Sequence, residues 1–193
     1  MKTKDEEILH IAAQMFADKG YEKMDVQKLA DALGIGKGTV YRHFFSKQEL
    51  FLATADRVIQ LLGQSIEEQS VNITDPIEKM KKAFKAFFAF FEKHPALAEM
   101  LIQDRAVFKE RQDHTYFQYR EQMAKKWQNY FEELIQKKIL RNISAEKMVH
   151  VFTTFLYGAL YVRFFTEHQY ASFQQAEDAL DMIFNGILNT KEL

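Results

Sequence analysis

The chain has 193 residues, 47% of them hydrophobic and 27% charged, a balance that is typical of a folded globular protein and argues against extended disorder. It has no cysteine, which excludes disulfides and cysteine-based metal sites, and its formal net charge of -1 requires any nucleic-acid-binding surface to be local. The charged N-terminus MKTKDEEILH shows no secretory signal, so we expect a cytoplasmic protein.

The elements predicted in chain order are all helices. Apolar residues recur every three to four positions, and no segment alternates with period two for long, so we expect no sheet. Four helix starts resemble capping boxes, at Thr3-x-x-Glu6, Ser46-x-x-Glu49, Asp75-Pro76-x-Glu78 and Ser172-x-x-Gln175. The predicted helices cover residues 4–19, 26–33, 37–44, 47–70, 76–93, 95–107, 111–139, 144–168 and 173–190.

The organisation changes near residue 47, where short helices with tight corners give way to long, aromatic-rich helices. We therefore expect two domains, residues 1–46 and residues 47–193, with helix 47–70 connecting them. The longest apolar tract, Val151 to Phe165, is shorter than the ~20 residues that a bilayer requires and contains Arg163. It predicts a buried helix and no membrane span.

The segment LGIGKGTVYRHF, residues 33–44, resembles a glycine-rich phosphate loop at first sight. A Walker-type loop needs glycine at position 31 and a hydroxyl residue at position 38, where the chain has Asp31 and Gly38. A dinucleotide fingerprint needs glycine at position 39, which is Thr39. The preceding residues also predict a helix rather than a strand, so the nucleotide-binding interpretation fails.

A helix-turn-helix fits the same residues. Asp25 can cap the first helix, and Gly34 stands just past its end, where a left-handed backbone is easiest for glycine. The positions predicted to face inward are Leu29, Ala30, Leu33, Ile35, Val40 and Phe44. In this motif the second helix enters the major groove of DNA.

The outward face of the second helix carries the predicted DNA contacts. Residues 36–47 contain Lys37, Arg42, Lys47 and His43 but no acidic residue, so positive charge is concentrated there. Arg42 can pair with guanine or a phosphate, and Lys47 stands at a helix N-terminus that favours anions. Any one of these residues could instead be an ordinary surface residue. The predicted contact set is Gln27, Gly36, Lys37, Gly38, Thr39, Tyr41, Arg42, His43 and Lys47.

Residues 8–51 closely resemble the N-terminal domain of the tetracycline-repressor (TetR) family of bacterial transcription regulators. The match is carried by the Ala12-Ala13 pair, Phe16, Gly20-Tyr21, Ile35, Lys37-Gly38-Thr39, Tyr41, Phe44 and Ser46-Lys47 with Glu49. The resemblance implies an all-α homodimer in which a larger C-terminal helical domain binds a small molecule and forms the dimer.

Two positions depart from the family pattern. The family usually places a Thr or Ser that touches a phosphate at the start of the second helix, where this chain has Met24-Asp25. It often has Ser or Thr before the recognition helix, where this chain has Gly36. These departures weaken the expectation of phosphate contacts from the second helix more than that of contacts from the recognition helix.

The C-terminal part predicts an apolar ligand pocket between helices and a dimer interface. Each aromatic residue could equally be ordinary core. The predicted ligand-binding set is Phe84, Phe87, Phe88, Phe91, Met100, Arg105, Tyr116, Met123, Trp127 and Phe155, with Arg111, Tyr119 and Arg163 as further polar candidates. Residues 144–168 are apolar on nearly all faces, and Gly158 and Gly186 favour close helix approach, so the last two helices predict the homodimer.

Three functions were weighed. The favoured one is a ligand-responsive repressor that binds a palindromic operator on double-stranded DNA as a homodimer and is released by a small apolar or amphipathic ligand. An enzyme is not supported, because no phosphate loop, nucleophile elbow or metal spacing among the six histidines is present, and no cofactor is implied. The alternative is a helical apolar-ligand-binding or interaction protein without DNA-binding activity, favoured by Gly36 and Asp25.

Overall fold

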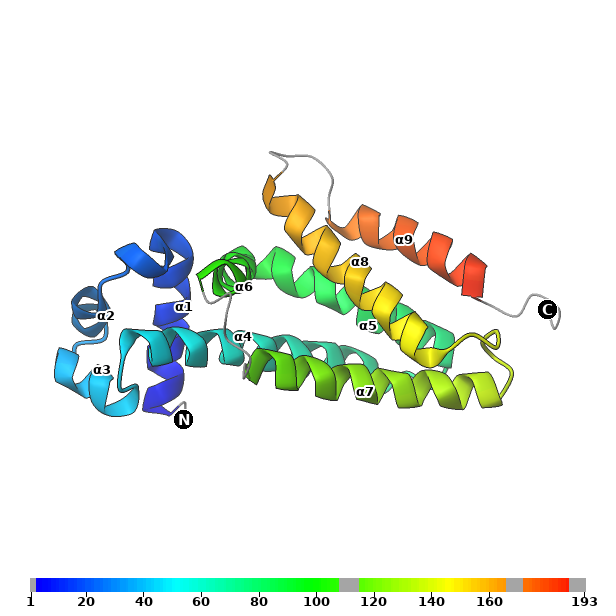
Figure 1. Cartoon of the computed structure of the whole chain (residues 1–193), viewed down its shortest axis with the longest axis horizontal. Helices are drawn as coiled ribbons and strands as arrows, with labels where there is room; N and C mark the ends of the chain where they lie inside the picture. The colour runs from blue at the N-terminus through cyan, green and yellow to red at the C-terminus, as the bar shows by residue number, and fades with distance from the viewer. Residues whose placement is uncertain (1–2, 108–114, 166–171, 188–193) are drawn as a thin grey trace. The chain divides into compact units, whose positions relative to one another are not determined.

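The computed structural model describes residues 3–107, 115–165 and 172–187, and the regular elements in these ranges are α-helices (Figure 1). The all-α prediction is confirmed. The side chains of residues 104–120, 160–176 and 186–193 lie outside the description. The helices are α1 Lys4–Lys23, α2 Val26–Ala32, α3 Lys37–His43, α4 Lys47–Ser70, α5 Pro76–Lys93, α6 Pro95–Val107, α7 Thr115–Gln136, α8 Ala145–Phe165 and α9 Ser172–Ile187.

Side-chain caps begin several of these helices. Thr3 and Glu6 form the full capping box of α1, with the Glu6 amide donating to Thr3 Oγ1 at 3.3 Å and the Thr3 amide donating to Glu6 Oε2 at 3.2 Å. The Glu49 amide donates to Ser46 Oγ at 3.0 Å, and the Glu78 amide donates to Asp75 Oδ1 at 2.7 Å. The fourth predicted cap, at Ser172, involves side chains outside the described residues.

Among the helix ends that do not adjoin undescribed residues, two differ from the prediction by more than one residue. Helix α1 continues past the predicted residue 19 to Lys23, with a kink at Gly20, whose φ of 73° lies in the left-handed region. Helix α7 ends at Gln136 instead of residue 139, because Lys138 takes a φ of 59° and the Ile139 amide donates back to the Leu134 carbonyl at 2.9 Å. Both differences arise from residues with positive φ, which the spacing of apolar residues does not reveal.

The first compact unit, unit 1, contains residues 1–62 and 94–116 and therefore α1 to α3, most of α4, and α6. Its core is built on Phe16 and Phe51, which are fully buried, with ring centroids 4.9 Å apart. The Tyr21 ring lies 5.3 Å from that of Phe51. Helix α6 packs against α1, where Gln103 Nε2 donates to the Ala17 carbonyl at 3.3 Å. This core fixes α1 and α4 behind the short helices.

The second compact unit, unit 2, contains residues 63–93 and 117–193. Its described core is aromatic, and Phe152 of α8 contacts rings of three other helices. That ring lies 5.9 Å from Phe84 of α5, 5.6 Å from Phe131 of α7 and 6.3 Å from Phe184 of α9. Helices α5 and α9 are joined further by the ion pair of Lys85 and Glu177 at 2.7 Å. Ring contacts therefore hold four helices together.

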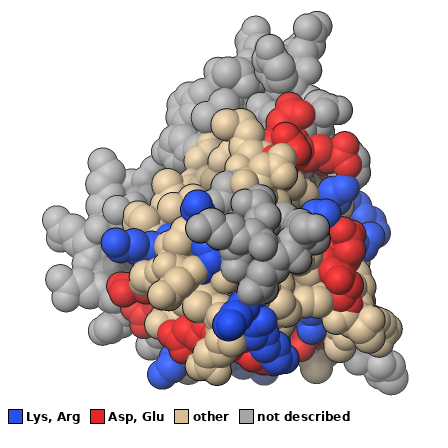
Figure 2. Space-filling model, turned by 90° about the vertical axis from the view of Figure 1, so that its right-hand side faces the viewer, with Lys and Arg blue, Asp and Glu red and all other residues tan. Residues whose placement is uncertain are grey.

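Charge on the surface of unit 2 is mixed. The ion pairs Lys81–Glu78, Lys126–Glu67 and Lys137–Glu133 are all exposed. On the face drawn in Figure 2, basic and acidic side chains are interspersed among the described residues. Such a surface creates little one-sign field to attract phosphates. None of the helices in the described part of the chain combines the length and the apolar character that crossing a membrane would need.

The described part of α8 is buried on one side within the single chain. Within this chain Met148 and Val149 are buried, whereas Val151 is 55% exposed and Thr154 and Gly158 are exposed. Among the described residues, a Cβ added at Gly158 would meet nothing within 4 Å. The single chain covers one side of α8 and leaves the opposite side open.

Gly34 and Gly38 make a matched test of backbone conformation. Gly34 has a φ of 63°, whereas Gly38 lies in helix α3, and a Cβ at either position meets nothing within 4 Å. We predict that Gly34→Ala lowers the free energy of unfolding by about 1 kcal/mol, because L-residues are strained in the left-handed region. Gly38→Ala should leave it unchanged or raise it by up to about 1 kcal/mol through better helix propensity. Urea denaturation followed by circular dichroism measures both, and equal losses would contradict this account.

Candidate nucleic-acid interface

The corner between α2 and α3 is closed by a Schellman motif. The Ile35 amide donates to the Ala30 carbonyl at 3.0 Å, and the Gly34 amide donates to the Asp31 carbonyl at 3.1 Å. This pattern places Gly34 at the position after the cap, which takes the left-handed conformation. Ile35 is half-buried at the corner as predicted. The last carbonyls of α2 are thereby satisfied, and the direction of α3 is set.

Helix α3 is anchored by its apolar side. Val40 is fully buried and Phe44, which follows the helix, is 8% exposed, as the sequence predicts. Gly36 is the N-cap with extended backbone and no side-chain cap, and its carbonyl accepts from the Thr39 amide at 2.8 Å. Gly38 is exposed, with open space where a Cβ would stand. A flat backbone patch therefore faces outward at the start of α3.

The outward face of α3 carries the polar side chains. Lys37, Arg42 and His43 are exposed, while Thr39 and Tyr41 are half-buried. Arg42 Nη2 donates to Thr39 Oγ1 at 2.9 Å, so the guanidinium lies along the helix surface beside the hydroxyl. This contact orients two predicted base-contacting side chains together before any partner binds. Preorganisation of this kind reduces the entropy that binding costs.

Lys47 is more constrained than the sequence suggests. It lies at the start of α4, where its ammonium donates to the Glu22 carbonyl at 3.0 Å and stands 5.0 Å from the centroid of the Tyr21 ring. Burial, helped by the nearby Glu22 and Tyr41, raises the pKa of the Tyr21 phenol, which keeps it a neutral donor. An ammonium has three donors, so two remain for an anion. Lys47 thus also ties the end of α1 to α4.

The start of α2 is capped by one acidic residue, Asp25. Asp25 Oδ1 accepts from the Gln27 amide at 2.8 Å, which confirms it as the cap of α2. The Gln27 side-chain amide in turn donates to Asp31 Oδ1 at 2.8 Å. The predicted contact residue Gln27 is therefore engaged along its own helix, between two carboxylates.

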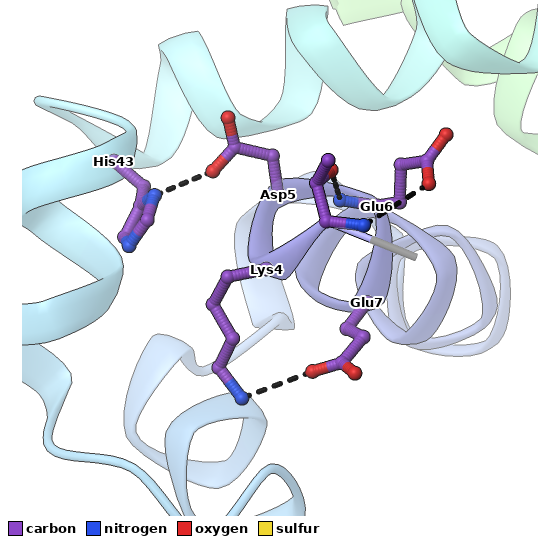
Figure 3. Close-up of polar contacts among 6 residues, drawn as sticks. Lys4, Asp5, Glu6, Glu7 and His43 are labelled. Atoms are coloured by element: carbon purple, nitrogen blue, oxygen red, sulfur yellow. Dashed lines mark hydrogen bonds and ion pairs between the residues drawn. The ribbon is translucent and has the colours of Figure 1, made fainter. Parts of the chain in front are cut away.

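Two contacts at the beginning of α1 are not predicted by the sequence pattern. His43 Nδ1 lies 2.5 Å from Asp5 Oδ1, and Arg57 Nη2 of α4 donates to Glu6 Oε1 at 2.9 Å (Figure 3 shows the first of these). The first turn of α1 therefore touches both the recognition helix and α4. These partners are separated by 38 and 51 residues in sequence, so no local pattern indicates them.

The predicted ligand-binding residues are divided between the two units. Met100 is fully buried in unit 1, and Phe84, Phe87, Phe88 and Phe91 of α5 are buried in unit 2. Phe155 of α8 stacks on Phe84 with ring centroids 5.7 Å apart, and it is half-buried like Met123 and Trp127 of α7. The side chains of Arg105 and Tyr116, and of Arg111, Tyr119 and Arg163, lie outside the described residues.

The phenylalanines of α5 form a connected cluster of buried rings. Phe84 contacts Phe88 at 5.5 Å, and Phe87 contacts Phe91 at 5.1 Å. Phe152 joins this cluster to α7 and α9 and was absent from the predicted set, although it stands one helical turn before Phe155. Among the side chains that the structure describes, no group of three His, Asp or Glu lies together in a way that could hold a metal ion.

The geometry of the first three helices agrees with comparisons to known proteins. The sequence model described as "Bacterial regulatory proteins, tetR family" matches residues 8–54, which include α2, the corner and α3. These residues therefore form a TetR-type N-terminal domain. The family match ends within α4, so it covers the helix-turn-helix and the anchoring Phe16–Phe51 core but none of unit 2.

The named relatives are HTH-type transcriptional regulators. The chain is 34% identical to the HTH-type transcriptional activator FasR of Mycolicibacterium smegmatis over 45% of this chain and 39% of that protein. It is 33% identical to the HTH-type transcriptional repressor KstR2 of the same species over 52% of this chain and 49% of that protein. The chain thus spans about half or less of the length of these curated relatives.

A solved structure shows the same fold along the whole length. The structure of AibR in complex with isovaleryl coenzyme A and operator DNA has a TM-score of 0.72 at 17% identity, covering 93% of this chain and 97% of that one. At this identity the likeness concerns the fold. The likeness in fold therefore extends into unit 2, beyond the residues that the family model matches.

Asp25 provides a test of the α2 N-terminus. We predict that Asp25→Asn strengthens DNA binding about threefold at low salt, because it removes a negative charge that would face phosphates, and charges a few ångströms apart interact by about 1 kcal/mol in water. Asparagine caps a helix as well as aspartate does, so stability should stay within about 0.5 kcal/mol. Fluorescence anisotropy with labelled duplex measures the affinity. The gain should vanish near 1 M salt, where screening is nearly complete, and a gain that persists there would rule out a charge effect.

Proposed function

We propose that this chain is a ligand-responsive, DNA-binding transcriptional regulator of the TetR family. The observation that carries the proposal is the exposed face of α3. It presents Lys37, Arg42 and His43 on a helix whose direction is set by the Gly34 corner, and residues 36–47 contain no acidic side chain. A helix of this kind enters the major groove and reads base edges there. The structure of AibR with operator DNA supports the same use of the fold.

Each side chain of α3 has a distinct role in the proposed complex. Arg42, oriented by Thr39, pairs with guanine through two parallel hydrogen bonds. Gly38 allows the backbone to approach the DNA closely, since a Cβ there would stand in the open space of the outward face. Lys37, Tyr41, His43 and Lys47 contact phosphates and fix the register without reading sequence.

We propose that the protein binds as a two-fold homodimer through α8 and α9. The open side of α8 exposes Val151, and Met182 of α9 is 78% exposed. Large apolar side chains in such positions are typical of a surface that another copy covers. A two-fold axis would place two copies of α3 about 34 Å apart, one turn of DNA, and so match a palindromic operator.

The ligand is proposed to be a small apolar or amphipathic molecule held among the aromatic side chains of the C-terminal domain, residues 47–193. The half-buried Phe155 stacks on Phe84 of the buried phenylalanine cluster of α5, and the half-buried Trp127 lies 5.9 Å from Phe131 between ring centroids. With the half-buried Met123 of α7, these side chains are the accessible part of this region. A ligand that binds better to a form unable to span two half-sites would shift the population toward it and release DNA. We favour repression, because occupation of an operator is by itself sufficient to block a promoter.

A second function remains open because of specific observations on α2 and α3. Asp25 places a carboxylate at the start of α2, and Gly36 offers no side-chain hydroxyl before α3. Both weaken phosphate binding. The alternative is therefore an apolar-ligand-binding helical protein that does not bind DNA. Gel shift with DNA from upstream of the protein's own gene separates the two functions.

Arg42 and Lys47 should differ in what they contribute to DNA binding. We predict that Arg42→Ala weakens binding to the preferred site by about tenfold and relaxes selection at one base position, because one bidentate base contact is lost. Lys47→Ala should weaken binding to all sequences alike and reduce the slope of log affinity against log salt by about 1. Anisotropy titrations at several salt concentrations measure both. A salt slope unchanged by Lys47→Ala would remove Lys47 from the phosphate contacts.

Met182 on the proposed dimer surface and Phe45 outside it are a matched pair of exposed apolar residues. We predict that Met182→Glu converts the dimer to a monomer at micromolar concentration, because an unpaired charge would be buried in the interface. Phe45, which is 81% exposed beside α3, is the control, and Phe45→Glu should leave the oligomeric state unchanged. Light scattering coupled to gel filtration measures the mass. A wild-type monomer, or a Met182→Glu dimer, would contradict the proposed interface.

A further inference from the structure

The contact between His43 and Asp5 constrains the chemistry of the recognition helix. His43 is the last residue of α3, and its Nδ1 lies 2.5 Å from Asp5 Oδ1 in the first turn of α1. Figure 3 shows the imidazole with Nδ1 toward Asp5 and the other ring nitrogen directed away from it. About a third of the His43 side chain and more than half of the Asp5 side chain are exposed, at 33% and 57%. The pair is therefore accessible to a partner of α3.

Asp5 is held in place by its neighbours. The capping box of Thr3 and Glu6 fixes the first turn of α1, and Glu6 Oε1 accepts from Arg57 of α4. Lys4 pairs with Glu7 at 3.0 Å on the same turn. The carboxylate of Asp5 thus reaches α3 from a turn that is itself fastened to α4.

The other charged groups around α3 have contacts of their own. Arg42 is bonded to Thr39, Lys37 stands 5.9 Å from the centroid of the Tyr41 ring, and Lys47 donates to the Glu22 carbonyl. Of the carboxylates of α1, Glu6 is paired with Arg57 and Glu7 with Lys4. Asp5 is the acidic group whose described contact is with His43.

Proton counting then limits what the second nitrogen can do. An ionised carboxylate only accepts hydrogen bonds, so Nδ1 must donate to Asp5. In a neutral imidazole the other nitrogen, Nε2, then carries no proton and can only accept. A phosphate oxygen is also an acceptor, so the two atoms would repel each other. Only the imidazolium ion donates from both nitrogens at once.

We propose that Asp5 is a positioning residue for DNA binding that directs His43 Nε2 at a phosphate and makes the contact depend on uptake of one proton. In the free protein His43 Nδ1–H donates to the Asp5 carboxylate, and Nε2 carries no proton. In the DNA complex Nε2 gains a proton and donates it to a phosphate oxygen. The imidazolium then lies between two anions, the Asp5 carboxylate and the phosphate. This inference rests on the proposed DNA-binding function and adds that affinity decreases as the pH rises.

The experiment measures affinity for the upstream duplex by fluorescence anisotropy at pH 6, 7 and 8 and constant ionic strength. Uptake of one proton at each His43 predicts that wild-type affinity falls as the pH rises, by up to about tenfold per pH unit for each protomer that binds. His43→Gln, which does not titrate, should show a flatter profile. Glu7→Gln, which removes a carboxylate of the same turn that does not contact His43, should keep the wild-type profile.

Asp5→Asn is the decisive variant. Its amide can donate to Nδ1, so a neutral imidazole can then carry its proton on Nε2 and still donate to phosphate. We expect a flatter pH profile and tighter binding than wild type at pH 8, with an unchanged melting temperature. A purely structural role for the pair would instead lower affinity equally at all three pH values.

The possible failures are distinguishable. No binding of wild type to any duplex at low salt and pH 6 would overturn the proposed function itself. Binding with the same pH profile for wild type, His43→Gln and Asp5→Asn would overturn the positioning role of Asp5 and leave DNA binding intact. Loss of folding in Asp5→Asn would show as a lower melting temperature, in which case the profiles of His43→Gln and Glu7→Gln decide the outcome.

Discussion

The left-handed turn at Gly34 is the constraint on which the proposed interface depends. Its two backbone hydrogen bonds, from Gly34 to Asp31 and from Ile35 to Ala30, end α2 and determine where α3 begins. Because Val40 and Phe44 are then buried, the polar side of α3 must face outward. The Lys37 and Arg42 charges therefore stay in solvent, together with the His43 imidazole. The corner thereby gives a chain of almost neutral net charge a locally basic helix face.

The surroundings of α3 combine rigidity with access. Arg42 donates a hydrogen bond to Thr39, Lys47 donates one to the Glu22 carbonyl, and His43 pairs with Asp5. Three of the polar side chains proposed to touch DNA therefore have an intramolecular partner. These contacts hold the side chains near the geometry proposed for the complex. They also mean that replacing one of them changes the free protein as well as the complex, which is why each proposed variant is compared with a matched control.

Local features of the fold could be predicted from the sequence, and long-range contacts could not. The cap at Asp25, the glycine after α2, and the inward positions Val40 and Phe44 each depend on neighbours within a few residues, so spacing reveals them. The pairs Asp5–His43 and Glu6–Arg57 depend on how α1 packs against α3 and α4, which no spacing encodes. In unit 2, the helical period of apolar residues places Phe84 and Phe155 on inward-facing sides of their helices. The same period occurs in helices that pack in a core and in helices that line a pocket. The ligand-binding residues therefore stay a proposal.

Guanine methylation protection with dimethyl sulfate tests most directly whether α3 occupies the major groove, because the reagent attacks guanine N7 on that side. With the protein saturating a duplex from upstream of its gene, this account predicts two groups of protected guanines, centred about 10 base pairs apart. In Arg42→Ala the protection of one guanine in each group should be lost. Saturated binding that leaves every guanine N7 reactive would contradict the account, because α3 would then not lie in the major groove.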